Sequence, residues 1–255
     1  GQGTEFDSLR DYVERDDARS IDWRATARRS TVVVRTWRPE RDRRIVLVLD
    51  TGRTSAARIG AAPRLDAALD AALLLGTLAS RAGDKVDLIA VDDRPRLLTK
   101  GSSESHGDAL AGLLESMAGL HPRLVETDGR RLVAEVLRRV RQRALIVLFT
   151  TLDEAAITEG LLPVLPSLTR KHVVMLASVT DPQVLAMLDG SADAQSGSDA
   201  RSAYDAAAAE RTLAAHRRVT ALLRRLDVEV VEAGPADFAS KVSDAYLALK
   251  GAGRL

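Results

Sequence analysis

The chain has 255 residues, enough for one large α/β domain or two smaller ones, and its 45% hydrophobic content allows a sizeable buried core. Its 37 basic and 36 acidic residues leave a net charge of +1, which argues against a broad basic surface for nucleic acid or an anionic membrane. The absence of cysteine excludes disulfides, thiolate zinc sites and cysteine nucleophiles.

The N-terminal segment combines charges with aromatic side chains. Between Glu5 and Arg44, 20 of 40 residues are charged, compared with 29% of the whole chain. Half of the eight aromatic residues also lie here: Phe6, Tyr12, Trp23 and Trp37. We expect these rings to anchor a non-sheet segment while its arginines pair with neighbouring aspartates. The predicted organisation is an N-terminal extension, residues 1–43, packed on a main domain, residues 44–255.

Apolar runs and turn residues predict alternating strands and helices along the rest of the chain. A β-branched run at residues 31–37 predicts a half-exposed strand. Later runs predict at least five mainly parallel strands: residues 44–50, 85–91, 144–150, 172–179 and 228–233. Between and after them the pattern predicts helices at residues 64–83, 106–117, 129–143 and 153–168, one ending near 227, and one at 235–250. The fold class is therefore α/β, a doubly wound, mainly parallel sheet with helices on both faces.

Local signals predict the loops and helix starts. Thr127 or Asp128 is expected to cap one helix, and Thr151 with Glu154 fits a capping box for another. The segment 189–202 is rich in Gly, Ser and Asp, which predicts a mobile loop. No apolar run reaches the roughly 18 residues of a membrane span, so we expect this chain to be soluble.

The carboxyl ends of the strands are the place to look for a site, because ligands bind there in such sheets. The first core strand ends in DTGRT, where Asp50 and Thr54 offer oxygen ligands for a hard cation such as Mg²⁺. Asp153 is a second candidate carboxylate, and Thr127 a further hydroxyl. An ordinary capping or strand-end role is equally compatible with Asp50 and more so with the other two.

Several enzyme signatures are absent. The chain has no phosphate-binding GxxxxGK[ST] loop, no GxSxG elbow and no HExxH zinc pair. The four histidines are scattered and none is a convincing ligand or base: His106, His121, His172 and His216. We therefore expect no catalytic residues.

The opening residues carry a longer motif. From Gly3 through about Val91 the chain resembles a bacterial family catalogued as domain of unknown function 58, whose pattern joins an "EF..LR.Y..GDD.R.IDW..TAR" block to a strand ending in a carboxylate. The residues that form this structural signature include Arg10, Tyr12, Asp16, Asp17, Arg19, Asp22, Trp23 and Arg28. Arg15 departs from the pattern, because glycine is common there.

This resemblance implies a von Willebrand factor type A-like domain that recognises other proteins. Members of the family are often tethered by hydrophobic helices upstream and encoded beside MoxR-type AAA+ ATPases. The implied function is a non-enzymatic interaction module that works with such an ATPase in the assembly or maturation of unknown client proteins. The implied location is the cytoplasm, with no membrane contact by this fragment and an upstream anchor left open.

The resemblance also bears on a metal site. The related metal-ion-dependent adhesion site resembles DxSxS, followed by a threonine and an aspartate from later loops. Asp50 and Thr54 match the first and last positions, whereas Gly52 lacks the first serine hydroxyl. With Thr127 and Asp153 as candidates for the later positions, we expect no cofactor and at most weak Mg²⁺ binding.

Two further hypotheses concern the same edge of the sheet. Partner binding is expected near Asp50, Gly52, Asp93 and Asp153, because loops on a rigid sheet commonly carry recognition. The alternative function is a magnesium-dependent aspartyl phosphatase or phosphotransfer enzyme that uses Asp50 as its nucleophile. Those enzymes resemble DxDx[TV], and Gly52 stands where the second aspartate would act as acid and base.

Overall fold

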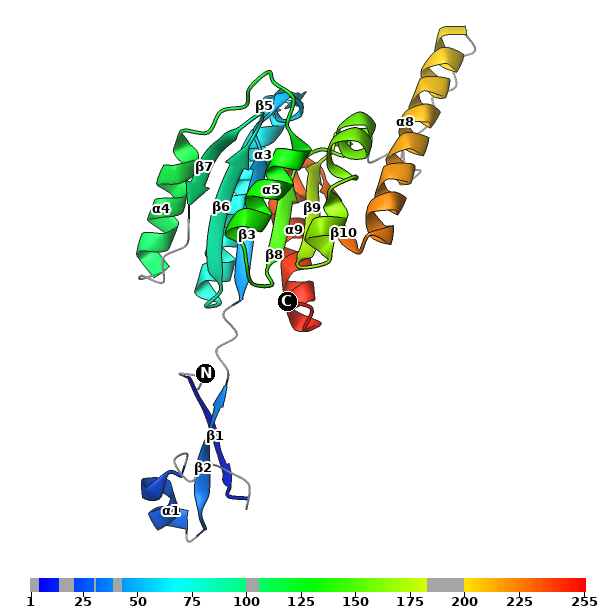
Figure 1. Cartoon of the computed structure of the whole chain (residues 1–255). Helices are drawn as coiled ribbons and strands as arrows, with labels where there is room; N and C mark the ends of the chain where they lie inside the picture. Colours follow the sequence, from blue (N-terminus) through cyan, green and yellow to red (C-terminus); the bar gives the residue numbers. More distant parts are fainter. Residues whose placement is uncertain (1–4, 14–20, 30, 39–42, 100–105, 183–199) are drawn as a thin grey trace. The chain divides into compact units, whose positions relative to one another are not determined.

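The computed structural model describes all residues except 1–4, 14–20, 30, 39–42, 100–105 and 183–199 (Figure 1). Two compact units make up the chain, residues 1–42 and 43–255. Most of the predicted mobile loop at 189–202 lies outside the described residues. Its last three residues begin helix α8 (Ala200–Arg225).

The N-terminal unit contains a two-stranded antiparallel sheet and one short helix. Strand β1 (Glu5–Asp11) pairs with β2 (Val33–Arg38). Helix α1 (Trp23–Arg29) follows Asp22, whose Oδ1 accepts hydrogen bonds from the two backbone amides of Arg24 and Ala25, each at 3.0 Å. These bonds satisfy helix-end donors that have no partner inside the helix.

The expectation of a non-sheet segment was therefore wrong for β1. Its sequence, EFDSLRD, has too many charges to indicate a strand alone. The β-branched strand β2 supplies the backbone partner, with Val33 and Val34 buried, so pairing decides the conformation.

The signature residues are spread through this unit. Arg10 lies in β1 opposite Val34, and Arg28 is an exposed residue of α1. Tyr12 is 37% exposed and Trp23 is 68% exposed, so the residues of its own unit do not bury the Trp23 ring. Three more lie outside the described residues: Asp16, Asp17 and Arg19. Packing of the extension on the main domain stays a prediction.

The second unit is built on one six-stranded sheet with the order β10-β9-β8-β3-β6-β7. Five strands are parallel, and β7 pairs antiparallel with β6. The strands are β3 (Arg44–Asp50), β6 (Lys85–Val91), β7 (Pro95–Thr99), β8 (Leu145–Phe149), β9 (Val173–Val179) and β10 (Val228–Ala233). This order is that of a doubly wound sheet, so the predicted fold class is confirmed.

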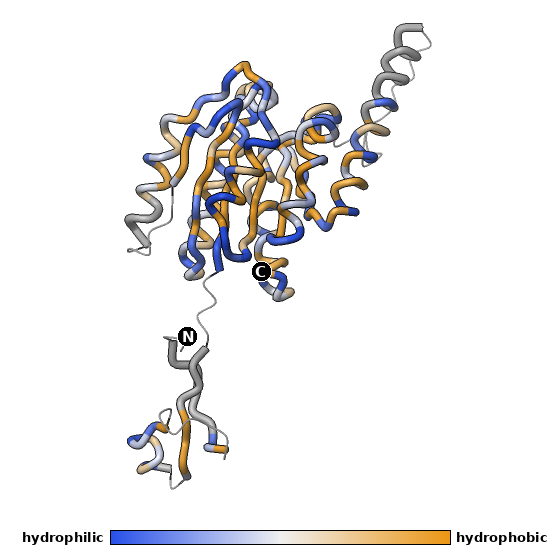
Figure 2. The backbone as a smooth tube through the Cα atoms, viewed as in Figure 1, coloured by the Kyte–Doolittle hydropathy of each residue, from blue (hydrophilic) through white to orange (hydrophobic). Residues whose placement is uncertain are grey.

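Helices cover both faces of this sheet (Figure 1). Those that pack on one face are α3 (Arg64–Arg81), α4 (His106–Ala118) and α9 (Pro235–Gly251). Those on the other are α5 (Gly129–Arg139), the π-helix η2 (Ala156–Leu161), α6 (Leu165–Thr169) and α8. The central strands are buried on both sides: Ile45, Leu47 and Leu49 face one core, and Val46 and Val48 face the other. Hydrophobic residues accordingly fill the strands without alternation (Figure 2).

Short elements occupy the connection that follows β3. They are helix α2 (Arg53–Ala56) and a small hairpin of β4 (Arg58–Ile59) with β5 (Ala62–Pro63). Helix α3 then returns along the sheet and contacts both α4 and α9. Because β3 is the strand where the winding changes direction, α2 begins at the point where such sheets bind ligands.

Candidate functional site

Asp50 is the last residue of β3, at this change of winding direction. Across the sheet it pairs with Val91 of β6, and Leu49 pairs with Phe149 of β8. Thr150 therefore follows β8 at the level of Asp50. The carboxylate lies at the carboxyl edge of the sheet between two neighbouring strand ends, and the residue is only 4% exposed.

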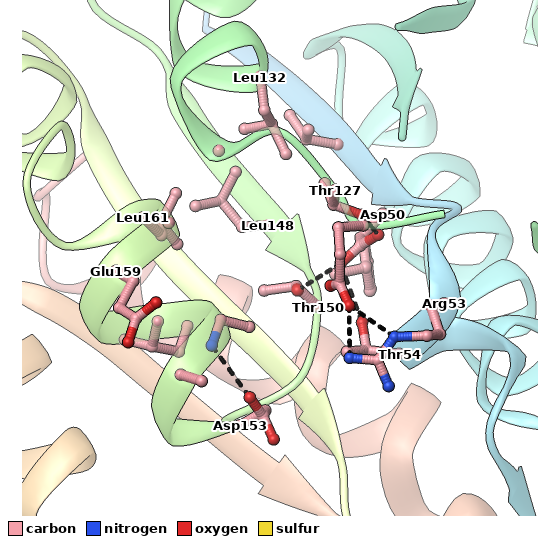
Figure 3. Close-up of a pocket in the computed structure, with 18 residues that line it drawn as sticks. Asp50, Arg53, Thr54, Thr127, Leu132, Leu148, Thr150, Asp153, Glu159 and Leu161 are labelled. Atoms are coloured by element: carbon pink, nitrogen blue, oxygen red, sulfur yellow. Dashed lines mark hydrogen bonds and ion pairs between the residues drawn. The ribbon is translucent and has the colours of Figure 1, made fainter. Parts of the chain in front are cut away.

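Four donors satisfy the two oxygen atoms of the Asp50 carboxylate (Figure 3). Oδ1 accepts hydrogen bonds from the Gly52 amide at 2.8 Å and from the Thr127 hydroxyl. Oδ2 accepts from the Thr150 hydroxyl at 2.7 Å and from the Thr54 hydroxyl at 3.4 Å. We call these five residues the Asp50 centre. Since each carboxylate oxygen has two acceptor positions, the protein itself fills them.

The loop between α4 and α5 closes over this centre. The Arg53 amide donates to the Val125 carbonyl oxygen, and the Arg123 amide donates to the Thr51 carbonyl oxygen, each at 2.8 Å. A Cβ atom added to Gly52 would overlap the Thr127 hydroxyl oxygen and lie 2.9 Å from the Val125 carbonyl oxygen. Position 52 therefore has no space for a side chain, which sequence analysis could not reveal.

A second carboxylate group lies after β6. Asp92 is fully buried and accepts a hydrogen bond from Arg96 Nε at 2.5 Å and from the Arg94 amide at 3.1 Å. Burial raises the pKa of Asp92, but the hydrogen bonds, led by that from Arg96, outweigh burial and hold it below its ordinary value. Asp93, a predicted partner-binding residue, exposes 52% of its side chain and accepts from Arg123 at 3.3 Å.

The remaining candidates have capping roles. Asp128 Oδ1 accepts from the Arg131 amide at 3.0 Å and caps α5, as predicted. Asp153 Oδ1 accepts from the Ala156 amide at 2.9 Å, so Asp153, and not the predicted Thr151 with Glu154, caps the turn that leads into η2. The Thr151 hydroxyl is buried and has no hydrogen-bond partner among the described residues.

The residues at this edge do not fit a magnesium site. Asp50 is the one carboxylate of its centre, and its oxygens already accept four hydrogen bonds. Position 52 cannot take the missing serine without displacing the Val125–Thr127 loop. In the part of the chain that the structure describes, no three His, Cys, Asp or Glu side chains group as a metal site. Mg²⁺ requires near-ideal octahedral oxygen coordination, and weak binding at most stays a prediction.

Two of the histidines, His172 and His216, lie away from the Asp50 centre. His172 is 4% exposed, and burial, followed by the charge of Lys171, lowers its pKa to about 4. Its ring is therefore neutral at pH 7. His216 Nε2 lies 2.5 Å from Glu232 Oε2, a hydrogen-bonded contact between α8 and β10. Neither residue is part of the Asp50 centre.

A cleft of about 400 Å³ opens beside the Asp50 centre (Figure 3). Its polar end is formed by Asp50, Thr54, Thr127 and Thr150. Apolar walls come from β3, β8, α5 and η2, namely Val48, Leu132, Leu148, Phe149, Ile157 and Leu161. Charged side chains also belong to its lining: Arg53, Glu126, Asp153 and Glu159. We call this space the β3–η2 cleft.

The structure thus brings together Asp50, Thr54 and Thr127 as predicted, and places Asp153 in the same cleft lining. Sequence analysis missed Thr150. Its position directly after an apolar strand was the available signal, because neighbouring parallel strands end at the same edge of the sheet.

A family model described as "Protein of unknown function DUF58" matches residues 8–200. The chain belongs to the DUF58 family. The resemblance predicted from the N-terminal motif is thereby confirmed. A search of the curated proteins found no significant match to this DUF58 protein.

Solved structures similar to this DUF58 protein have low sequence identity. A von Willebrand factor type A protein from Catenulispora acidiphila is 14% identical, with a TM-score of 0.46, over 84% of this chain and 43% of that one. The PilB minor pilin from Streptococcus sanguinis is 11% identical, with a TM-score of 0.49, over 86% and 64%. The conserved hypothetical protein BatB from Bacteroides thetaiotaomicron is 16% identical, with a TM-score of 0.39, over 54% and 66%. This chain therefore spans less than half of the Catenulispora protein.

None of the helices in the described parts of the chain is long and apolar enough to cross a membrane.

Proposed function

We propose that this chain is a non-enzymatic protein-interaction module that binds its partner through the carboxyl edge of the sheet. The observation that supports this most is Leu124, which is 82% exposed on the loop that closes the Asp50 centre. That loop is held by backbone hydrogen bonds to residues 51 and 53. An apolar side chain on a rigid loop is a suitable anchor for a partner, because little conformational entropy is lost on binding.

The residues around Leu124 favour a protein partner. Arg53 and Glu126 form an exposed ion pair, with Arg53 Nε donating to Glu126 Oε1 at 2.6 Å. Asp93 and Arg123 form a second pair on the same edge. An apolar centre with charged surroundings is the usual composition of a transient protein interface.

We further propose that the partner is a MoxR-type AAA+ ATPase, and that the two act in the cytoplasm on the assembly or maturation of other proteins. Family membership and the resemblance of the N-terminal motif support this choice, because members are often encoded beside such ATPases. The client proteins are not identified by this reasoning.

The geometry weighs against the phosphatase alternative. A nucleophilic carboxylate must present a free oxygen to phosphorus, but both Asp50 oxygens accept two hydrogen bonds and the residue is buried. Gly52 supplies no acid or base. We therefore propose that Asp50 has a structural role.

The test is binding of the purified chain to a MoxR-type ATPase from the same organism, measured by biolayer interferometry. Leu124→Glu should weaken binding about tenfold or more, since a buried charge replaces an apolar anchor. The matched control is Leu247→Glu, which changes an exposed leucine of α9 that is 51% exposed. Equal weakening by both variants, or by Leu247→Glu alone, would count against the proposed face.

A further inference from the structure

The β3–η2 cleft carries an excess of negative charge. Four carboxylates and a single guanidinium, that of Arg53, belong to its lining. Arg53 is already paired with Glu126. Arg64 lies outside the lining but close enough to Asp153 and Asp181 to interact with both charges. Asp50 and Glu159, in contrast, form no ion pair within the described part of the chain.

Asp50 is the more unusual of these two carboxylates. It is more than nine-tenths buried and points into the cleft, yet its four partners are an amide and three hydroxyls, none of which is a counter-ion. A buried charge of this kind is costly unless it is paired. A cation in the cleft would lower that cost.

The hydrogen-bond directions also select the kind of ligand. Thr54, Thr127 and Thr150 each use the hydroxyl proton to donate to Asp50. A hydroxyl has one proton and two acceptor positions, so these groups can offer a ligand only acceptors. The polar end of the cleft therefore suits a hydrogen-bond donor and excludes a carboxylate or phosphate.

The walls of the cleft favour a ligand with an apolar stem. Leu148 lies between the polar end and the side that carries Glu159, Leu161 lies next to Glu159, and Leu132 lies on the α5 side of the cleft (Figure 3). Lysine and arginine bury their methylene stems along apolar surface while their charged ends make polar contacts. A volume of about 400 Å³ is ample for one such side chain.

We propose that the β3–η2 cleft binds a basic side chain, lysine or arginine, of a partner protein. The apolar stem lies along Leu132, Leu148 and Leu161. The charged end donates hydrogen bonds to the threonine oxygens beside Asp50, and the negative charge of Glu159 attracts it. This inference rests on the proposed interaction function and specifies what one part of the interface recognises.

The experiment uses the whole chain labelled with ¹⁵N and titrated with Nα-acetyl-lysinamide or Nα-acetyl-argininamide. Amide signals of Gly52, Thr127 and Thr150 should shift and saturate. Nα-acetyl-norleucinamide, which has an apolar side chain without charge, should leave them unchanged. Glu159→Gln should lower the affinity for the basic amides about threefold, because one exposed charge is lost. The control Glu115→Gln removes an exposed carboxylate of α4 and should have no effect.

Three outcomes would overturn the inference: no saturable shift with either basic amide, equal binding of the norleucine compound, or equal weakening by Glu115→Gln. Capture of the ATPase together with any of these would leave the proposed function standing and remove only the basic-side-chain site. Saturable binding of the basic amides without capture of the ATPase would leave the basic-side-chain site standing and contradict the proposed ATPase partner.

Discussion

Gly52→Ser is expected to destabilise the protein by about 3 kcal/mol, although serine is the residue that the related metal site has at this position. The new Cβ atom would overlap the Thr127 hydroxyl and press on the Val125 carbonyl oxygen, so the covering loop must move. Backbone strain does not contribute, because Gly52 has an extended conformation with φ −82°. Urea denaturation followed by circular dichroism measures the change.

The matched control for this variant is Gly112→Ser in α4. A Cβ atom there meets nothing within 4 Å, so that substitution should be neutral or slightly stabilising. If Gly52→Ser proved as stable as the unchanged protein, the loop would not be closed over the Asp50 centre as described.

Asp50→Ala should have a still larger effect, a loss of about 4 kcal/mol in the free energy of unfolding. Without the carboxylate, the Gly52 amide and the hydroxyls of Thr127 and Thr150 lose their acceptor in a largely buried place. Each buried donor left without a partner costs about 1–3 kcal/mol, reduced here because the hydroxyls are partly exposed.

Thermal and urea denaturation of three variants distinguish a structural role of Asp50 from a general sensitivity of the protein to loss of a carboxylate. Asp50→Asn keeps one acceptor oxygen and should lose roughly half as much stability as Asp50→Ala. Asp244→Ala removes an exposed carboxylate of α9 and should change little. A stable Asp50→Ala protein would contradict a structural role for this residue. Loss of partner binding in an unfolded Asp50→Ala protein would say nothing about the interface.

The sheet could be predicted from the sequence because its strands are buried on both faces. Runs such as RIVLVLD and LIVLF have no polar interruption, and their length excludes long helices. Strand β1 was missed because its conformation depends on pairing with β2 rather than on its own residues. The π-helix η2 was predicted as part of one longer helix, and local periodicity cannot distinguish the two.

The Asp50 centre could be predicted in part. Asp50 and Thr54 are near in sequence, and Thr127 comes from the loop between α4 and α5 at the same edge of the sheet. The lack of space at Gly52 could not be predicted, because it arises from a loop more than 70 residues away. In the sequence, a glycine in place of serine looks like a missing ligand. In the structure, the absence of a side chain at Gly52 leaves the space that Val125 and Thr127 occupy.

We propose that hydrogen bonds within the protein, and not a metal ion, complete the Asp50 centre. Calorimetric titration of the purified chain with Mg²⁺ and Mn²⁺ tests it most directly. We predict only weak binding without a stoichiometric end point, and no increase in melting temperature when Mg²⁺ replaces a chelator. Tight one-to-one binding that is lost in the Asp50→Asn protein would contradict the claim.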